Sequence, residues 1–507
     1  MYPRMGGSYD KLKANLKATA MLPYDGTSPS SIETYGQRLI GSTLRKTPGV
    51  CDIPPRYLET QGGEMTKGVF GTLIEKFYYG IDPGNKACSP DFVDAGVELK
   101  TNALVKRTKG FSSKERLVLQ MIDYKAIIDE SFDSSCFMRK SRLMMLISHT
   151  FQESSNFVDA PIPFAGLIDW DQLPTTEQNI IREDWATIAE KVRSGRAHQL
   201  SGSDTKYLEA CPKAADSSQE VSQPNSEHRA KPRAFALKAG YVTSLVHRIS
   251  EGAGRPGPAE VLGVDEQLAI TDAASVAADG FEATVLRKFV EFKGLEVDSI
   301  EARLGLRLYG NAIGLSLNKN AKDYRAQLAR HMIGVTTKRV AEFDRAGIEI
   351  KTILLDRNGN PPEHMSFPAF KYMGPGSVLE EDWDSLEDEE APRFKRHLEA
   401  TRFLFVVYSN DGGMTTLNDV FFWSMLPEDI ESFVRPVWQR TVDSILSGNL
   451  EALPGASFNE VCHVRPHAQN REDTWPTPRN GPQVKKSFWL DKKYIQKQIK
   501  EHAITEV

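Results

Sequence analysis

The feature that most constrains the fold of this 507-residue chain is a repeat that extends over much of its length. Solenoid proteins repeat units of about 20–50 residues, whereas the similar segments here lie roughly half a chain apart. This spacing predicts two copies of one fold, a pseudo-dimer within a single chain. Three pairs of segments carry the repeat: 90–101 with 341–352 (PDFVDAGVELKT and AEFDRAGIEIKT), 183–200 with 436–453, and 210–214 with 464–468.

A stretch rich in Gly and Pro separates the two copies. The sequence SEGAGRPGP at 250–258 has the composition of a linker. A chain of this length exceeds what one hydrophobic core usually holds. We therefore predict a domain at 1–250, a linker at 251–259 and a second domain at 260–507. Short alternating strands mixed with amphipathic helices predict an α/β (α+β layered) fold around a central mixed sheet in each half.

The run PDFVDAGVELKT at 90–101 reads as a hairpin whose second strand carries an acid and a base on one face. Side chains alternate along a strand, so Glu98 and Lys100 point one way while Val97 and Leu99 point into the core. The first arm can bring Asp91 beside Glu98. Two carboxylates and the Leu99 carbonyl are suitable ligands for a hard divalent cation. The Lys100 ammonium would then face an anion, most naturally a phosphodiester, which predicts metal-assisted hydrolysis.

A Glu-x-Lys triplet by itself is also consistent with a solvated strand that carries a surface ion pair. The upstream segment adds context, because apolar residues at helical spacing in 67–77 predict a helix that presents Glu75. Gly71, one turn earlier, permits the close approach of another backbone. Glu75 is then either a third acidic ligand or an ordinary surface glutamate.

Two phrases in this region, KGVFGTLIEKFYYG (67–80) and PDFVDAGVELKT, resemble those of the MutH-type nucleases. Over nearly its whole length the chain is similar to the GATC-cutting type II restriction endonucleases of the Sau-three-A type. The matching stretches are SSKERLVLQMIDY (112–124), RAFALKAGYVTS (233–244), TRFLFVV (401–407), CHVRPHAQNR (462–471) and KKSFWLDKKYIQKQ (485–498).

The resemblance implies two copies of the PD-(D/E)xK nuclease fold and magnesium-dependent cleavage of duplex DNA on the 5′ side of the G in GATC. It implies a partner methyltransferase in the same restriction–modification system. Four residues match the catalytic set of these nucleases: Glu75, Asp91, Glu98 and Lys100. Within that set, Asp91, Glu98 and Glu75 are the expected metal ligands, together with the carbonyl of Leu99.

By the same resemblance, the loop at 207–217 should enter the major groove, with Lys213 donating to guanine. The family has an arginine where this chain has Cys211, and a tyrosine linked to adenine-methylation sensing where it has Ala236. Basic residues near the loop are candidates for phosphate contacts, and two residues of the second copy match the base-reading positions. The predicted DNA-binding residues are Lys213, Lys206, Arg233, Lys238, Arg465 and His467.

The second copy retains part of the acidic set, with Glu342, Glu349 and Lys351 at the positions of Asp91, Glu98 and Lys100. Ala329 stands where the first copy has Glu75, and the longer Glu342 side chain displaces its carboxylate. Catalytic groups need placement within about 0.5 Å, so a degenerate second site is expected. In the resembled family the C-terminal copy binds DNA and regulates cutting. One intact site per chain predicts a monomer that pairs on its DNA target.

Composition fits a nuclease only loosely, because the formal net charge is −5 and does not indicate a nucleic-acid binder. The five cysteines have no Cys-x-x-Cys spacing, so neither a zinc site nor a disulfide framework is expected, and a reducing cytoplasm fits best. No segment approaches the length of a membrane-spanning helix. Two rival functions remain: a mismatch-repair-type nicking enzyme acting at GATC, and a non-cleaving DNA-binding regulator.

Overall fold

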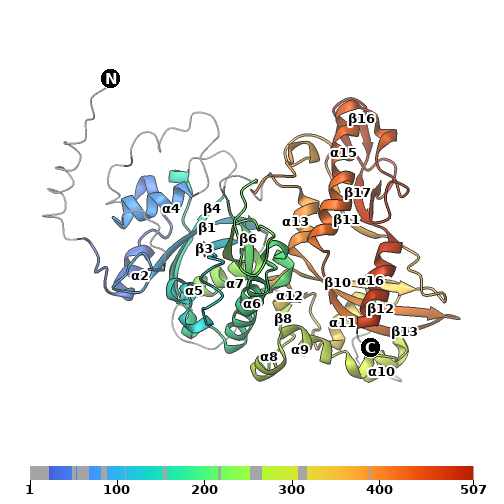
Figure 1. Cartoon of the computed structure of the whole chain (residues 1–507), viewed down its shortest axis with the longest axis horizontal. Helices are drawn as coiled ribbons and strands as arrows, with labels where there is room; N and C mark the ends of the chain where they lie inside the picture. Colours follow the sequence, from blue (N-terminus) through green and yellow to red (C-terminus); the bar gives the residue numbers. More distant parts are fainter. Residues whose placement is uncertain are drawn as a thin grey trace. The chain divides into compact units, whose positions relative to one another are not determined.

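A computed structural model describes residues 22–47, 53, 68–81, 88–108, 110–151, 157–214, 218–251, 265–306, 317–386 and 390–505 (Figure 1). The chain divides into two compact units. Unit 1 comprises residues 1–106, 136–172 and 248–256, and unit 2 comprises 107–135, 173–247 and 257–507. Both units are therefore assembled from segments that are far apart in the sequence.

Unit 1 is built around three strands, β1 (Glu98–Arg107), β4 (Leu143–Thr150) and β5 (Phe164–Asp169). β1 runs parallel to β4, and β5 runs antiparallel to β4, so the sheet is mixed as predicted. The helical elements of unit 1 are α2 (Pro29–Gln37), η1 (Leu44–Lys46), α4 (Val69–Leu73), the π-helix η2 (Ile74–Tyr78), α5 (Cys136–Ser141), η4 (Phe157–Asp159) and η5 (Trp170–Gln172).

An aromatic cluster fixes the helices of unit 1 against its strands. The Tyr35 and Tyr78 rings stack with centroids 4.3 Å apart, and each hydroxyl donates to the backbone carbonyl of the other residue. Tyr79 is fully buried and donates to the Ile32 carbonyl. Because buried polar groups need partners, these bonds define how α2 meets the α4–η2 segment. Val97 and Leu99 belong to the same core, which confirms the predicted inward face of the strand.

Unit 2 contains two three-stranded antiparallel sheets and a second mixed sheet. The antiparallel sheets have the orders β3-β7-β6 and β11-β17-β14, and the mixed sheet has the order β10-β12-β13. The strands are β2 (Gly110–Ser113), β3 (Leu117–Met121), β6 (Leu208–Pro212), β7 (Arg233–Leu237), β8 (Glu266–Gln267), β9 (Arg339–Val340), β10 (Ile348–Leu355), β11 (Met365–Phe370), β12 (Arg402–Asp411), β13 (Met414–Trp423), β14 (Cys462–Pro466), β15 (Thr474–Thr477), β16 (Gly481–Val484) and β17 (Lys486–Leu490).

The helices of unit 2 flank these sheets. They are η3 (Phe132–Ser134), α6 (Thr175–Arg193), η6 (Ala197–Gln199), η7 (Gly202–Asp204), α7 (Ala239–Ser250), α8 (Ala273–Asp279), α9 (Phe281–Arg287), η8 (Val290–Phe292), α10 (Val297–Arg303), α11 (Tyr324–Met332), α12 (Ala341–Ala346), η9 (Val378–Glu380), α13 (Arg393–Ala400), α14 (Pro427–Asp429), η10 (Ile430–Val434), α15 (Arg435–Ser447), η11 (Leu450–Ala452) and α16 (Lys492–Thr505).

The mixed sheet β10-β12-β13 follows the pattern of β1-β4-β5. In each, the first strand runs parallel to the second, and the second runs antiparallel to the third. The antiparallel sheets also share one arrangement, since the last strand in the sequence lies between the other two in both β3-β7-β6 and β11-β17-β14. The predicted mixed α/β fold class is confirmed.

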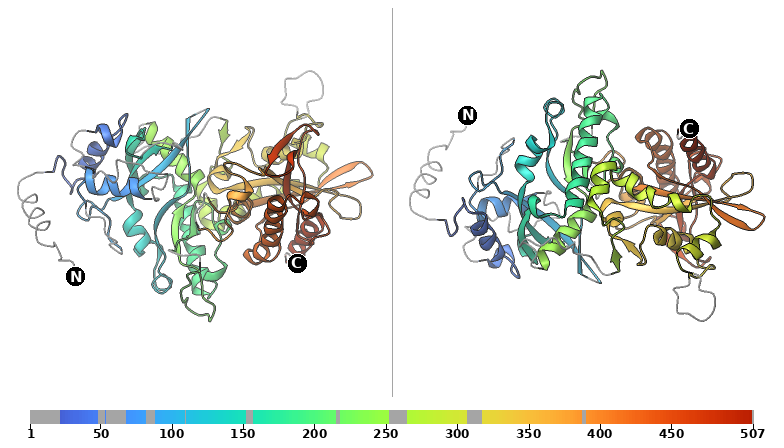
Figure 2. Two further views of the ribbon diagram at one scale, coloured as in Figure 1. Left: turned by 90° about the horizontal axis from the view of Figure 1, so that it is seen from above. Right: turned by 90° about the horizontal axis from the view of Figure 1, so that it is seen from below.

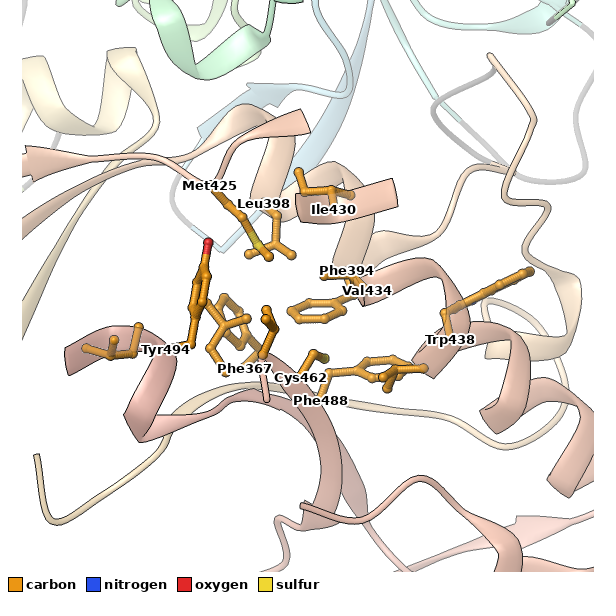
Figure 3. Packing of buried hydrophobic residues seen from close by; sticks show 14 of the residues in the cluster. Phe367, Phe394, Leu398, Met425, Ile430, Val434, Trp438, Cys462, Phe488 and Tyr494 are labelled. Carbon is orange, nitrogen blue, oxygen red and sulfur yellow. The ribbon is translucent and has the colours of Figure 1, made fainter. Parts of the chain in front are cut away.

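A hydrophobic core rich in aromatic side chains lies in the C-terminal part of unit 2 (Figure 3). The Phe394 and Phe488 rings stack at 4.8 Å with an interplanar angle of only 3°. Both α15 and α16, drawn in the red colours of the C-terminal residues in Figure 2, place side chains in this cluster, among them Trp438 and Tyr494. Helices and strands of the C-terminal half are therefore joined by one apolar interior.

Within unit 2, residues from before and after the predicted linker pack together. Arg345 of α12 contacts Glu177 of α6 at 3.1 Å, and both side chains are almost fully buried. Gly240 lies so close to the Asp344 carbonyl that a Cβ atom there would be 2.1 Å from the oxygen. The predicted linker itself lies, from residue 252 onward, outside the described residues.

The cysteine spacings predict no disulfide framework, but two cysteines pair in the structure. Cys88 and Cys136 form a disulfide with a Cα–Cα distance of 5.0 Å, although 48 residues separate them in the sequence. The spacing rule failed because it searches for cysteines that are neighbours in sequence, whereas these two meet only in the fold. Among the described residues, no helix is both long and apolar enough to cross a membrane.

Candidate active site

The predicted acidic strand begins at a tight turn in unit 1. Phe92 and Val97 form an antiparallel bridge, and Gly96 has a φ of 68°, a conformation that favours glycine. One carboxylate oxygen of Asp91, Oδ2, accepts a hydrogen bond from the Leu99 backbone N–H at 2.9 Å. The first arm thus brings Asp91 onto the acidic strand as the sequence predicted.

Glu98 is the most enclosed acid of the group, with only 2% of its surface exposed. Its Oε1 accepts from the ammonium group of Lys100 at 2.7 Å and lies 3.1 Å from that of Lys140. Its Oε2 is buried and has no hydrogen-bond partner in the described part of the chain. A buried carboxylate oxygen without a partner is costly, so this atom is suited to accept a ligand.

Lys140 is a site residue that the sequence analysis missed. It lies on α5, directly before β4, and β4 pairs with β1 so that Glu98 is opposite Met144. Nothing in the local sequence marks Lys140, because its contact with Glu98 depends on parallel strand pairing across more than forty residues. A sequence search could have found it only by first assigning β4 as the parallel neighbour of β1.

Glu75 projects from the π-helix η2 toward the same acids. Burial, together with the negative charges of Asp91 and Glu98, raises the pKa of Glu75 to about 6, while Lys100 opposes the shift. Gly71 permits the close approach predicted for it, since a Cβ atom there would lie 3.2 Å from Thr101 Oγ1 on β1. The helix therefore lies close enough to β1 for the charges of Asp91 and Glu98 to act on Glu75.

The donor set fits a hard divalent cation. Three mutually repelling carboxylates, one with an unpartnered buried oxygen, favour a positive ion between them. Their ligand atoms are more widely spaced than in a tight cluster: among the described residues, only His364, His463 and Asp491 place three such atoms within 4.8 Å of one another. At the acidic strand, Lys100 and Lys140 supply the positive charge that faces Glu98.

The segment predicted to be the second copy holds a similar acid–base pair in unit 2. Glu349 lies on β10, where Lys351 contacts its Oε2 at 3.0 Å and His397 of α13 lies 3.2 Å from its Oε1. Burial would raise the pKa of Glu349, but the neighbouring His397 and the charge of Lys351 outweigh it and lower the pKa to about 2. His397 thus occupies the role that Lys140 has in the first copy.

The other acidic positions of the second copy are lost to the site. The carboxylate of Glu342 is 1% exposed and accepts backbone N–H bonds from Ala269 at 2.9 Å and Ile270 at 2.7 Å. Both of its oxygens are thereby engaged in holding a neighbouring segment. Ala329, at the position of Glu75, is fully buried on α11. Glu349 is left as the one acid of this copy that retains the geometry of the first.

Two of the six lysines, arginines and histidines predicted to contact DNA are buried. Lys206 is 6% exposed and pairs with Glu183 at 2.9 Å. Lys238, also 6% exposed, donates to the carbonyls of Thr205 and Ala346 at 2.7 and 2.8 Å. Burial lowers the pKa of Lys238 to about 8. Both lysines are therefore buried and bonded within the protein, where they are not available to contact phosphates. This differs from their predicted role.

The remaining predicted contacts are placed at comparable strand ends. Lys213 is exposed and follows β6, and His467 is exposed and follows β14, each directly after a proline. Arg465, also exposed, lies over the Trp489 ring at 5.7 Å. Arg233 of β7 donates to the Ala210 carbonyl at 2.7 Å, so its guanidinium is partly engaged.

Comparison with known proteins agrees with this geometry. Over 497 residues the chain is 31% identical to the type II restriction enzyme Sau3AI of Staphylococcus aureus, covering 88% of this chain and 95% of that protein. The family profile of the DNA mismatch repair enzyme MutH matches residues 79–184. The MutH proteins of Shewanella woodyi and Shewanella sp. (strain ANA-3) are 26% and 25% identical over 36% of this chain and 77% and 80% of their own lengths.

Proposed function

Because the chain belongs to the family of the type II restriction enzyme Sau3AI, we propose that it is a site-specific deoxyribonuclease that cuts duplex DNA at GATC, on the 5′ side of the G, with Mg²⁺ as cofactor. The observation that carries the proposal is the convergence of Glu75, Asp91, Glu98 and Lys100 in unit 1. The MutH match at 79–184 spans three of these four residues.

In this mechanism Glu75, Asp91 and Glu98 would hold the cation, and the Leu99 carbonyl would add a further oxygen ligand. The bound ion would polarise the scissile phosphate and lower the pKa of a coordinated water. Lys100 orients or deprotonates the attacking water and offsets negative charge as the phosphate gains a fifth oxygen. Lys140, which contacts the same carboxylate oxygen, supplies a second positive charge beside the developing anion.

The chain is proposed to contain two copies of the PD-(D/E)xK fold, with residues 1–250 catalytic, 251–259 as linker and 260–507 as a DNA-binding, non-cleaving copy. The shared strand patterns of the two mixed sheets and of the two antiparallel sheets support this duplication. The engagement of Glu342 with backbone amides and the replacement of Glu75 by Ala329 support loss of cleavage in the second copy.

Sequence recognition is assigned to Lys213 in the first copy and to Arg465 and His467 in the second, because all three are exposed at equivalent strand ends. Arg233 is retained as a candidate phosphate contact. A chain with one cleaving site cuts one strand, so two molecules pair on the DNA to break both. Its partner methyltransferase protects the host sites, and both act in the cytoplasm, where the DNA is.

The test is cleavage of a GATC-containing plasmid in Mg²⁺ by the wild type and by two matched variants, Glu98→Ala and Glu349→Ala. Both substitutions remove a glutamate that is paired with a lysine two residues later. We expect Glu98→Ala to abolish cutting and Glu349→Ala to leave the cleavage step intact. Equal loss in both variants would refute the assigned asymmetry, and cutting by Glu98→Ala would refute the site.

The match to MutH makes a nicking enzyme the second candidate. The same plasmid assay separates the two. Linear product that accumulates with second-order dependence on protein concentration supports paired restriction. Nicked circles that persist at high protein concentration would support the repair-type activity instead.

A further inference from the structure

The two antiparallel sheets of unit 2 allow their residues to be matched by register. In β3-β7-β6, Leu117 and Leu208 both pair with Leu237. In β11-β17-β14, Met365 and Cys462 both pair with Leu490. Residues one step along each strand therefore correspond: Arg116 with His364, Glu209 with His463, and Lys238 with Asp491.

In the first sheet these three positions form a cluster of charges that neutralise one another. Arg116 contacts Glu209 at 2.9 Å, and Glu209 also acts electrostatically on Lys238. Lys238 in turn donates to two backbone carbonyls. A buried carboxylate with two neighbouring cations needs no further ligand.

In the second sheet the same positions hold two imidazoles and one carboxylate. Asp491 Oδ2 lies 3.4 Å from His364 Nδ1 and 3.7 Å from His463 Nδ1, and the two rings meet edge to face with centroids 4.6 Å apart. One ligand atom from each residue lies within 4.8 Å of the others. Ligand atoms around a tetrahedral zinc ion lie roughly 3.3 Å apart, so the three side chains would move closer together around an ion. His364 Nδ1 accepts the Lys492 backbone N–H at 3.2 Å and would give up that bond if it were the coordinating atom.

His463 provides an independent sign that a ligand is missing from this cluster. Its side chain is completely buried, yet neither ring nitrogen has a hydrogen-bond partner among the residues that the structure describes. Burying an imidazole with both nitrogens unsatisfied is expensive. Glu209, at the matching position of the first sheet, has Arg116 as an ion-pair partner. The missing partner is therefore a feature of the second sheet and not of the arrangement that the two sheets share.

We propose that His364, His463 and Asp491 form a binding site for a zinc-class divalent transition metal. Two neutral imidazoles and one carboxylate are a typical ligand set for Zn²⁺, and nitrogen ligands disfavour Mg²⁺ and Ca²⁺. His364 retains 14% side-chain exposure, which gives the ion a route in and leaves a fourth position for water.

The surroundings are compatible with this assignment. His364 and His463 would coordinate through neutral imidazole nitrogens. Arg465 and Lys492 are the other charged groups that act on this pair, and both are positive. Asp491 is the one negatively charged group among these neighbours, so it alone would balance a bound divalent ion. We therefore expect the site to bind the ion with moderate affinity.

The three ligands lie at the start of β11, within β14 and at the junction of β17 with α16. A bound ion would therefore cross-link three segments at one end of the sheet. Its role is structural, because the ligands are distinct from the acids proposed for cleavage. Loading with metal should raise the thermal stability of the chain, since a ligand that binds only the native state stabilises it.

Co²⁺ is the probe for this site, because its visible absorption reports nitrogen and oxygen coordination directly. The titration uses full-length protein carrying Glu98→Ala, which weakens the acidic site of unit 1 as a competing ligand set. We expect one equivalent of Co²⁺ to produce a tetrahedral or five-coordinate spectrum that Zn²⁺ abolishes by displacement. A rise in melting temperature with Zn²⁺ should accompany it.

Three variants decide the assignment in that background. His364→Ala and Asp491→Asn should each lower Co²⁺ affinity at least tenfold. His331→Gln is the control that should not, because His331 lies on α11, where its ring bonds the Gln327 carbonyl away from the proposed ligands. Circular dichroism confirms that each variant is folded, and His364 is the safest site because it is the most exposed ligand. Absence of stoichiometric binding by the parent, or equal binding by all variants, would overturn the proposal.

Discussion

Lys140 and Lys100 converge on one atom, Oε1 of Glu98, at 3.1 and 2.7 Å. The two ammonium groups arrive from different elements, since Lys100 lies on β1 and Lys140 on α5. Lys140 lies outside the Glu-x-Lys triplet and reaches Glu98 only through the fold. Substitution of Lys140 therefore tests the site independently of that sequence pattern.

Replacing Lys140 by Met should slow cleavage by roughly two orders of magnitude, because it removes a positive charge that faces the reacting phosphate. Lys140→Arg should recover part of the rate. His397→Gln is the matched control, since His397 makes the corresponding contact with Glu349 in the second copy. Single-turnover cleavage of a GATC duplex measures all three, and an unchanged rate in Lys140→Met would exclude a role for this lysine.

Metal affinity should rise with pH through the titration of Glu75. With a pKa of about 6, this carboxylate is mostly protonated at pH 5 and mostly ionised at pH 7, and only the ionised form binds a cation. The ionised fraction changes about tenfold over that interval. Mg²⁺ titrations of cleavage at the two pH values should show a matching change in the concentration required, and saturating Mg²⁺ should move the midpoint to lower pH.

Glu75→Gln provides the control for this pH effect. The amide cannot ionise, so the step near pH 6 should disappear while overall Mg²⁺ affinity falls. Persistence of the same step in Glu75→Gln would mean that another group titrates.

The Cys88–Cys136 disulfide should stabilise the chain by roughly 4 kcal/mol, on the basis of the 48-residue separation that it closes. Cys136→Ser, or treatment with a thiol reductant, should lower the midpoint of urea unfolding accordingly. Because Cys136 begins the helix that carries Lys140, we also expect slower cleavage. Cys462→Ser is unsuitable as a control because that thiol is buried in the core, so reductant-treated Cys136→Ser serves instead and should show no further change.

Substitution of Lys213 should weaken DNA binding, whereas substitution of Lys238 should lower the stability of the fold. Lys213→Ala removes an exposed amine and should weaken binding to a GATC duplex by about 1–3 kcal/mol without altering unfolding. Lys238→Met strands the carbonyls of Thr205 and Ala346 and should destabilise the protein by about 1–3 kcal/mol. Fluorescence anisotropy measures binding, and urea unfolding measures stability. Destabilisation by Lys213→Ala, or a stable Lys238→Met with weakened DNA binding, would contradict these roles.

The sequence predicted the acidic strand because strand alternation is a local property. Leu99 faces inward and Asp91 folds back onto the strand, as the spacing of the run indicated. Mixed α/β layers were likewise expected from periodicity. These features depend on residues within a few positions of one another, where backbone geometry restricts the alternatives.

The features that sequence reasoning missed all depend on long-range contacts. Lys140 reaches Glu98 through parallel strand pairing, and Cys88 meets Cys136 through the fold of unit 1. Lys206 and Lys238 are predicted phosphate contacts because they lie in the sequence close to the DNA-reading loop, but the fold buries both against other partners. His364, His463 and Asp491 carry no motif, since strand register alone brings them together.

The last segment of unit 1 begins at residue 248, at the end of α7. Its Ile249 packs against Gly166, where a Cβ atom would lie 3.0 Å from the Ile249 side chain. As the ribosome extends this polypeptide, every proposed catalytic side chain emerges well before that closing segment does. Unit 1 would thus stay incomplete during synthesis until the residues around Ile249 have left the exit tunnel.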